Sequence, residues 1–96
     1  MDKNVKITDY HYYPESDELD LVINVDKPQP AVSVLVDDDL YLRLDPDTNQ
    51  VVGATILNVS AFCADMARAF ALKELSNANV RFFFEQKVGS LSPAYA

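Results

Sequence analysis

The segment LYLRLDPDTNQVVGATILN, residues 40–58, predicts one complete β-hairpin. Apolar and polar residues alternate on both sides of its Pro-Asp-Thr-Asn turn, as a half-buried antiparallel pair of strands requires. Gly53 interrupts the second strand, where glycine commonly marks a bulge or the close approach of another backbone or ring, and Tyr41 on the paired strand is a candidate to pack over it. The segment therefore predicts a small sheet-based domain and contains no catalytic motif.

A second turn of the same kind lies upstream, because YPESDEL (residues 13–19) matches DPDTNQV (residues 45–51) in residue class at nearly every position. Proline suits the second position of a type I turn, and Asp or Asn tolerates a left-handed conformation at its end. We therefore expect a hairpin between a strand ending near Tyr13 and a strand over residues 18–25. The first strand changes phase near Asp9, so that either a bulge lies there or the strand begins there.

Residues 32–44 are apolar at even positions except at Asp38. They form either one long strand interrupted by a bulge at the aspartate triplet 37–39 or two short strands that turn there, and we favour the turn. Ser60 is a suitable N-cap for a helix over residues 60–76, which is apolar on two sides and ends at the asparagines of residues 77–79. Residues 80–85 (VRFFFE) have the composition of a strand, with a short helix as the alternative.

These elements predict an α+β fold in a single domain over residues 1–96. We expect an antiparallel meander of four to five strands, one long helix packed on one face, and a short strand-like segment near the C-terminus. The 49% of hydrophobic residues is sufficient for a core and disfavours intrinsic disorder.

The net charge of −7 is unevenly distributed. Residues 1–50 contain twelve acidic and four basic residues, which gives −8, whereas residues 51–96 contain three acidic and four basic residues, which gives +1. Phosphate binding needs a basic patch, so nucleic acid is disfavoured as a partner. The acidic half predicts attraction of a basic protein partner, with solubility alone as the competing explanation.

The sequence contains no apolar run long enough to span a membrane, and its first residues lack the apolar centre of a signal peptide. The single cysteine, Cys63, excludes an internal disulfide, and no Cys and His cluster is present to hold zinc. We therefore expect a cytoplasmic protein without a cofactor or metal.

Histidine, serine and cysteine are the residue types that are candidates for catalysis. His11 is the only histidine, and the serines lack a Gly-x-Ser-x-Gly motif, so we assign no catalytic residue. Cys63 lies in the first turn of the predicted helix, where the helix dipole lowers the pKa of a thiol. It also shares a face with Phe62 and Met66, and we favour a buried, inert role.

The spacing Asp45-x-Asp47-x-Asn49 matches the start of a calcium-binding loop. Gln50 occupies the position of the required glycine, and Ile56 that of the bidentate glutamate. The segment therefore favours a plain turn over a metal site.

Two segments, YYPESDELDL (residues 12–21) and VVGATILN (residues 51–58), together resemble the prokaryotic domain-of-unknown-function family 2283. The matching residues are Tyr12, Pro14, Glu15, Asp17, Leu19, Leu21, Val51, Val52, Gly53, Ile56 and Leu57. Thr55 departs from an acid that is frequent in the family, and residues 20–21 depart from a commonly aromatic pair. The resemblance implies no activity. Some relatives are encoded beside small toxin-like proteins, so it implies an antitoxin or partner-neutralising role.

We therefore predict a small interaction protein, not an enzyme, that forms a homo-oligomer such as a dimer. Its expected interface lies on the second side of the helix and in the C-terminal segment, at Leu72, Leu75, Phe82, Phe83 and Phe84. The alternative is a ligand-binding or enzymatic pocket between helix and sheet, lined by Tyr10, Tyr12, Phe62 and Phe70.

Overall fold

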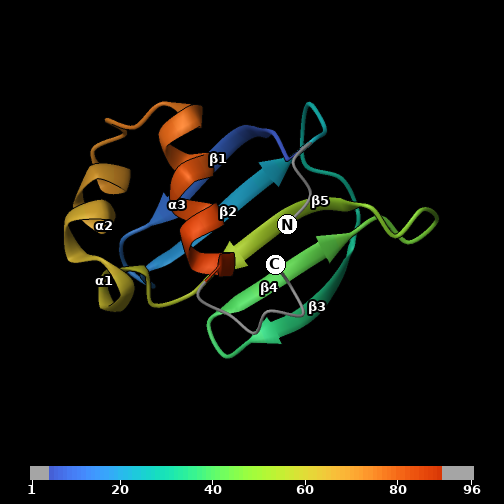
Figure 1. Cartoon of the computed structure of the whole chain (residues 1–96), viewed down its shortest axis with the longest axis horizontal. Helices are drawn as coiled ribbons and strands as arrows, with labels where there is room; N and C mark the ends of the chain where they lie inside the picture. The colour runs from blue at the N-terminus through green and yellow to red at the C-terminus, as the bar shows by residue number, and fades with distance from the viewer. Residues whose placement is uncertain (1–4, 90–96) are drawn as a thin grey trace.

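Five antiparallel strands form a single sheet, and three helices lie against one of its faces in the computed structural model, which describes residues 5–89 (Figure 1). The strands are β1 (Ile7–Tyr13), β2 (Glu18–Ile23), β3 (Val32–Asp37), β4 (Leu40–Leu44) and β5 (Val51–Ile56). The helices are α1 (Val59–Phe62), α2 (Ala64–Ala71) and α3 (Asn77–Gly89). The predicted α+β class with an antiparallel sheet is confirmed.

The strand order is β1-β2-β5-β4-β3, so that the last strand in the chain lies in the middle of the sheet. This order differs from the predicted meander, in which each strand would lie beside its neighbour in sequence. The loop over residues 24–31, which contains Pro28 and Pro30, carries the chain from β2 to the far edge, and β4 and β5 then return toward β2. Proline disfavours ladder pairing in this loop because it lacks a backbone donor.

Both predicted hairpin turns are present, and each ends in a left-handed residue. Asp17 has φ 57° at the β1–β2 turn, and Asn49 has φ 61° at the β4–β5 turn. In the second turn the backbone N–H of Asn49 donates to the Asp45 carbonyl at 2.8 Å. The short polar side chains of Asp and Asn tolerate this conformation, as the sequence indicated.

The aspartate triplet forms a turn, since β3 ends at Asp37 and β4 begins at Leu40. A bulge also shifts the register between Leu35 and Asp37, so the structure contains both the turn and a bulge next to it. The phase change in the first strand is a second bulge, between Ile7 and Asp9.

The predicted helix over residues 60–76 was wrong in its continuity. Cys63 adopts extended angles (φ −159°, ψ 105°) and separates α1 from α2, and α2 ends at Ala71 before Lys73 takes a left-handed φ of 55°. The break places Phe62 and Phe70, one from each helix, against the same ring of Phe83, with centroids 5.5 and 5.1 Å away.

The C-terminal strand-like segment was also wrong, because residues 77–89 form helix α3. Ser76 accepts the backbone N–H of Asn79 through its Oγ at 3.3 Å, in the manner of an N-cap. Val80, Phe83, Phe84 and Lys87 follow at intervals of three and four residues, and all four are buried. The asparagines of residues 77–79 therefore begin a helix, where the sequence analysis placed the end of one.

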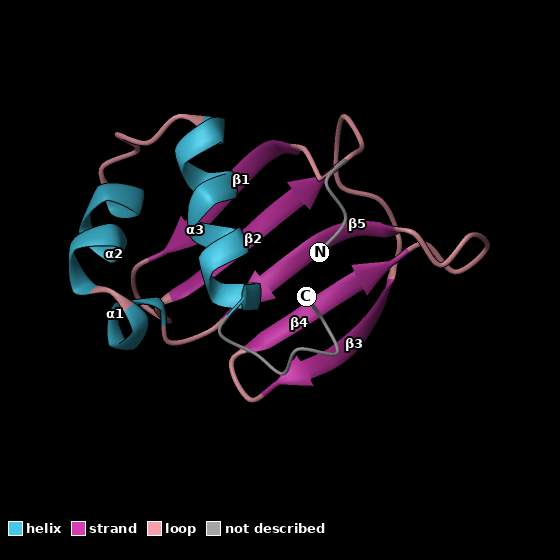
Figure 2. Cartoon of the chain, viewed as in Figure 1, coloured by secondary structure: helices cyan, strands magenta, loops and turns pink. Residues whose placement is uncertain are grey.

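The helices cover the sheet unevenly (Figure 2). Both α2 and α3 pack against β1, and the buried core lies between the helices and strands β1, β2 and β5, with Leu40 at the start of β4. Strand β3, at the opposite edge, has a largely exposed pattern along its length. We call β1 and β2 the covered half of the sheet and β3 and β4 the open half; β5 lies between them.

Candidate functional site

The four residues predicted to line a pocket between helix and sheet lie close together, but they pack against one another. The Phe70 ring lies 5.7 Å from Tyr10 in an edge-on arrangement and 6.1 Å from Tyr12 in a stacked one. Phe62 contacts Phe83, which completes the cluster. The Tyr10 hydroxyl donates to the Leu75 carbonyl at 2.8 Å. Phe70 lies in the core, Tyr10 and Tyr12 are partly buried against it, and Phe62 is 40% exposed, so the four rings pack at the core and its margin.

A hydrogen-bonded group joins the first hairpin to the helical layer. The Tyr12 hydroxyl donates to Asp17 at 2.5 Å, and the Ser60 hydroxyl donates to the other oxygen of the same carboxylate. The backbone N–H of Ser60 also points at this carboxylate, at 3.1 Å from each oxygen. Asp17, remote in sequence, therefore performs the capping role that was assigned to Ser60.

The electrostatics of this group follow from its bonds. Partial burial raises the pKa of Tyr12 to about 12, and the hydrogen bond to Asp17 and the charge of Asp17 add to the effect. Partial burial alone would raise the pKa of the Asp17 carboxyl, but the donors from Ser60 and Tyr12 outweigh it, and the pKa lies below its ordinary value. Both pKa shifts reflect stabilisation of the neutral Tyr12 phenol and the charged Asp17 carboxylate at neutral pH. The hydrogen-bonded group of Tyr12, Asp17 and Ser60 therefore suits a structural role.

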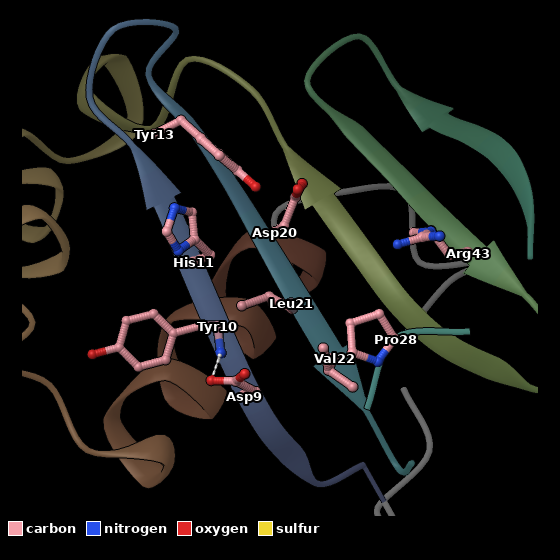
Figure 3. Close-up of a pocket in the computed structure, with 9 residues that line it drawn as sticks. All are labelled: Asp9, Tyr10, His11, Tyr13, Asp20, Leu21, Val22, Pro28 and Arg43. Carbon is pink, nitrogen blue, oxygen red and sulfur yellow. Dashed lines mark hydrogen bonds between the residues drawn. The ribbon is translucent and has the colours of Figure 1, made fainter. Parts of the chain in front are cut away.

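A hollow of about 260 Å³ lies on the opposite face of the sheet, away from the helices (Figure 3). Tyr10 borders it from β1, but its ring points to the helical side in Figure 3. His11 and Tyr13 form one wall, with ring centroids 4.3 Å apart. The remaining lining residues are Asp9, Asp20, Leu21, Val22, Pro28 and Arg43.

Carboxylates gather beside this hollow on β2. The Thr55 hydroxyl donates to Asp20 at 2.9 Å and fixes its carboxylate. The pKa of the neighbouring Glu18 is raised, first by partial burial and then by the charge of Asp20. His11 lies opposite Asp20 in the strand register.

Gly53 permits the close packing beneath the hollow. A Cβ at this position would lie 2.8 Å from the Leu21 carbonyl oxygen and 3.4 Å from the Arg43 Cδ. Tyr41, which the sequence suggested as the group over Gly53, pairs with Thr55, and Arg43 is the residue opposite the glycine. The close approach was therefore predicted correctly and its side chain wrongly.

The residues of the predicted interface divide into two groups. Leu72 and Phe82 lie on the surface, 61% and 64% exposed. Leu75 is partly buried against the core, and Phe83 and Phe84 lie within the core. The run of three phenylalanines therefore faces two directions on α3, and only its first ring is open to solvent.

The most exposed apolar strand, β3, was not recognised as a surface feature from the sequence. Val32, Val34 and Leu35 are 53%, 41% and 57% exposed. The alternation of Val32 and Val34 with Ser33 resembles that of a half-buried strand, and the sequence carries no signal that β3 lies at an edge. Only the strand order shows this position.

The segment with calcium-like spacing, residues 45–49, forms a turn in which the Asp45 carboxylate already accepts protein hydrogen bonds. The Asp45 carboxylate accepts the backbone N–H groups of Asp47 at 2.8 Å and Thr48 at 3.1 Å, and the Gln29 side chain at 2.9 Å. The N–H groups of Asp47 and then Thr48 lower the pKa of Asp45. Within residues 5–89 the structure contains no group of three or more His, Cys, Asp or Glu arranged to hold a metal ion.

Cys63 is a free thiol of intermediate burial at the junction of α1 and α2. In the part of the chain that the structure describes, no helix is long and apolar enough to cross a membrane. Comparisons of this chain with protein-family models, curated proteins and solved structures find no match.

Proposed function

We propose that the protein is a non-enzymatic protein–protein interaction module, which self-associates through its helical layer and offers its acidic sheet half to a basic partner. The distribution of exposed apolar side chains supports this proposal. Leu72 and Phe82 are exposed on the helical layer, and Val32, Val34 and Leu35 are exposed on the far edge of the sheet. Exposed apolar groups gathered on one element are typical of interaction surfaces.

The neighbourhood of Phe82 supports contact between two identical copies. Arg81 and Glu85 form an ion pair at 2.6 Å beside it on α3, and a shallow hollow of about 220 Å³ lies between these residues, Ala78 and Phe82. A two-fold contact places the same patch of both copies face to face, so a patch with one positive and one negative group complements itself. Phe82 supplies the apolar centre of such a contact.

Light scattering after size-exclusion chromatography tests self-association. We expect a dimer mass for the protein and a monomer mass for Phe82→Glu, while Val34→Lys, on the opposite edge of the sheet, keeps the dimer. A monomer at every concentration removes self-association from the proposal. Loss of the dimer in Val34→Lys alone moves the interface to β3.

The resemblance to family 2283 supports a partner-neutralising, antitoxin-like form of this function. Three of the motif residues have structural roles: Tyr12 donates a hydrogen bond to Asp17, and Gly53 allows the backbone of β2 to approach closely. The motif thus specifies a fold on which an interaction surface can vary. Capture of a basic protein from the native host, identified by mass spectrometry and repeated with purified partner, tests this part.

Small-ligand binding is the second candidate, and the hollow on the exposed face of the sheet favours it. The rings that were expected to form a pocket fill their own space, but Asp20, His11, Tyr13 and Arg43 surround a real depression. Titration of the protein with zwitterionic amino acids, followed by NMR, tests this candidate. Saturable shifts confined to these four residues would favour it over the interaction module.

A further inference from the structure

We propose that the free edge of β3 accepts an extended, basic segment of a partner protein, which adds to the sheet as a further strand. This inference rests on the proposed function as an interaction module and specifies the chemistry of the partner. It concerns the edge of the open half, at the greatest distance in strand order from the covered edge β1.

The edge of β3 presents both backbone and apolar groups. Among the described residues β3 pairs with β4 alone, so alternate N–H and C=O groups along its other side point away from the sheet. Val32 and Val34 are exposed on one face and Leu35 on the other. No charged residue lies between Val32 and Val36. A strand added here gains main-chain hydrogen bonds together with apolar contacts on alternate residues.

Carboxylates stand at both ends of this edge. Asp37 ends β3, and Asp38 and Asp39 follow it. At the other end Val32 pairs with Leu44 of β4, and the turn after Leu44 holds Asp45 and Asp47, one strand in from the edge. A strand rises about 3.4 Å per residue, so the six positions from Asp37 to the residue opposite Asp45 span roughly 20 Å. Asp38 and Asp47 are exposed, and within residues 5–89 no hydrogen bond or ion pair engages either side-chain carboxylate. Basic residues five or six positions apart in an extended segment can reach both groups.

Two basic residues near this edge, Arg43 and Lys27, do not neutralise the negative charge of the aspartates. Arg43 projects over the face of the sheet toward Gly53, and its guanidinium reaches the Gln29 carbonyl at 3.5 Å. Lys27 is exposed in the preceding loop. The five aspartates of the two groups therefore outnumber these two basic residues near the edge.

The same charges disfavour a second copy of this chain as the occupant. In an antiparallel pairing of two β3 edges, the aspartate triplet of one copy lies near the end of the other β3, one strand away from the turn with Asp45 and Asp47. In a parallel pairing the two triplets meet each other. Like charges brought close to one another are unfavourable in both cases. The bulge beyond Leu35 and the proline at position 30 also keep the usable edge short, which limits open-ended strand addition.

A pair of synthetic peptides tests the inference on the full chain. The first, labelled with fluorescein, alternates valine and threonine and carries two lysines at each end; the second carries two glutamates at each end. We expect saturable binding of the first by fluorescence anisotropy, weaker at about 500 mM than at about 50 mM salt because of screening, and no binding of the second. In NMR spectra the amide shifts should fall on residues 32–37 and 40–44.

Matched variants separate the edge from general charge. Asp38→Lys combined with Asp47→Lys should weaken binding of the lysine peptide by about tenfold or more. Glu15→Lys combined with Glu74→Lys makes the same change of net charge away from β3, and should leave binding within about twofold. Val34→Lys should weaken it as well. Dispersed NMR spectra confirm that each variant is folded.

Three results would overturn the inference: equal binding of both peptides, equal loss in the control variant, or amide shifts centred on Asp9 and Asp20. Its failure and that of self-association are distinguishable. If the protein is monomeric but binds the lysine peptide, only the self-association proposal is refuted. If it is a dimer but binds neither peptide, only the β3 edge proposal is refuted.

Discussion

The covered and open halves of the sheet are built from similar sequence patterns and have opposite surroundings. In β2, Leu19, Leu21 and Ile23 alternate with polar residues and are fully buried beneath the helices. In β3, Val32 and Val34 alternate in the same way and remain exposed. Strand order and helix placement, which depend on the whole chain, decide which alternating face enters the core. The comparison predicts that substitutions cost most stability in the covered half and least in the open half.

The largest effect is expected from Phe70→Ala in the covered half. Phe70 is 1% exposed and contacts Tyr10, Tyr12 and Phe83, so truncation leaves a cavity at the centre of the aromatic cluster. We expect a loss of about 3–5 kcal/mol in the free energy of unfolding, measured by urea denaturation. Phe82→Ala, which removes an exposed ring, is the control; measured at concentrations where the protein is monomeric, it should change stability by no more than about 0.5 kcal/mol. Equal losses would contradict the assigned core.

Gly53→Ala tests the boundary between the halves. Glycine has no positive φ here, so alanine would ordinarily stabilise the strand slightly. The new Cβ would instead lie 2.8 Å from the Leu21 carbonyl, and we expect destabilisation of about 1–3 kcal/mol in thermal or urea unfolding. Ser33→Ala on β3 is the matched control with little expected effect. Unchanged or raised stability in Gly53→Ala would show that β2 and β5 are less closely packed.

Asp17→Ala breaks the connection between the first hairpin and α1. Loss of the bonds from Tyr12 and Ser60 should cost about 1–2 kcal/mol at neutral pH, by chemical denaturation. The folded pKa of Asp17 is lowered, so its contribution is present above the unfolded pKa, about 4, and is lost as pH falls through the folded value. The stability difference between the protein and the variant should therefore shrink below pH of about 4. A pH-independent difference would contradict the role of the carboxylate.

Tyr12→Phe tests the other partner of that group at high pH, with an expected cost of about 0.5–1 kcal/mol at neutral pH. The folded pKa of about 12 exceeds the unfolded value of 10.0, so the contribution of Tyr12 is complete below pH 10 and is lost as pH rises through about 12. Ultraviolet titration of tyrosinate should show one phenol ionising late, and the variant should lack it. An unchanged titration curve would contradict the hydrogen bond to Asp17.

The smallest effect is expected from Val34→Thr in the open half. Val34 is exposed, and among residues 5–89 neither α2 nor α3 packs extensively against β3, so stability should change by no more than about 0.5 kcal/mol. Amide hydrogen exchange in the same samples should be faster along β3 than along β2 and β5. Leu21→Ala, a truncation in the covered half, should cost about 2–5 kcal/mol. Similar losses at both positions would remove the distinction between the halves.

Local chemistry allowed the hairpins to be predicted from sequence. The turns at Asp17 and Asn49 and the bulge near Asp9 depend on neighbouring residues, and the pattern of each predicts its backbone. Residues 80–85 were assigned to a strand, with the helix that the structure shows only as the alternative, because three consecutive phenylalanines conceal the helical spacing of Val80, Phe83 and Phe84. The cap at Ser60 was misassigned because its acceptor, Asp17, lies in the turn of the first hairpin, remote in sequence from α1.

Surface features depend on long-range arrangement and were predicted less well. Tyr10, Tyr12, Phe62 and Phe70 were correctly grouped, but a sequence does not show whether neighbouring rings fill a space or enclose it. The edge position of β3 follows from the insertion of β5 between β2 and β4, since the β2–β5 pairing joins residues far apart along the chain.

The central place of β5 has a consequence for how the chain acquires its structure. Until residues 51–56 join, the β1–β2 and β3–β4 hairpins share no hydrogen-bonded border, and each keeps its inner side unsatisfied. The β2–β5 contacts join residues distant in sequence and are slow to form. We therefore expect the two hairpins to stay independent during synthesis until β5 has emerged, with unpaired strand edges that are prone to aggregation.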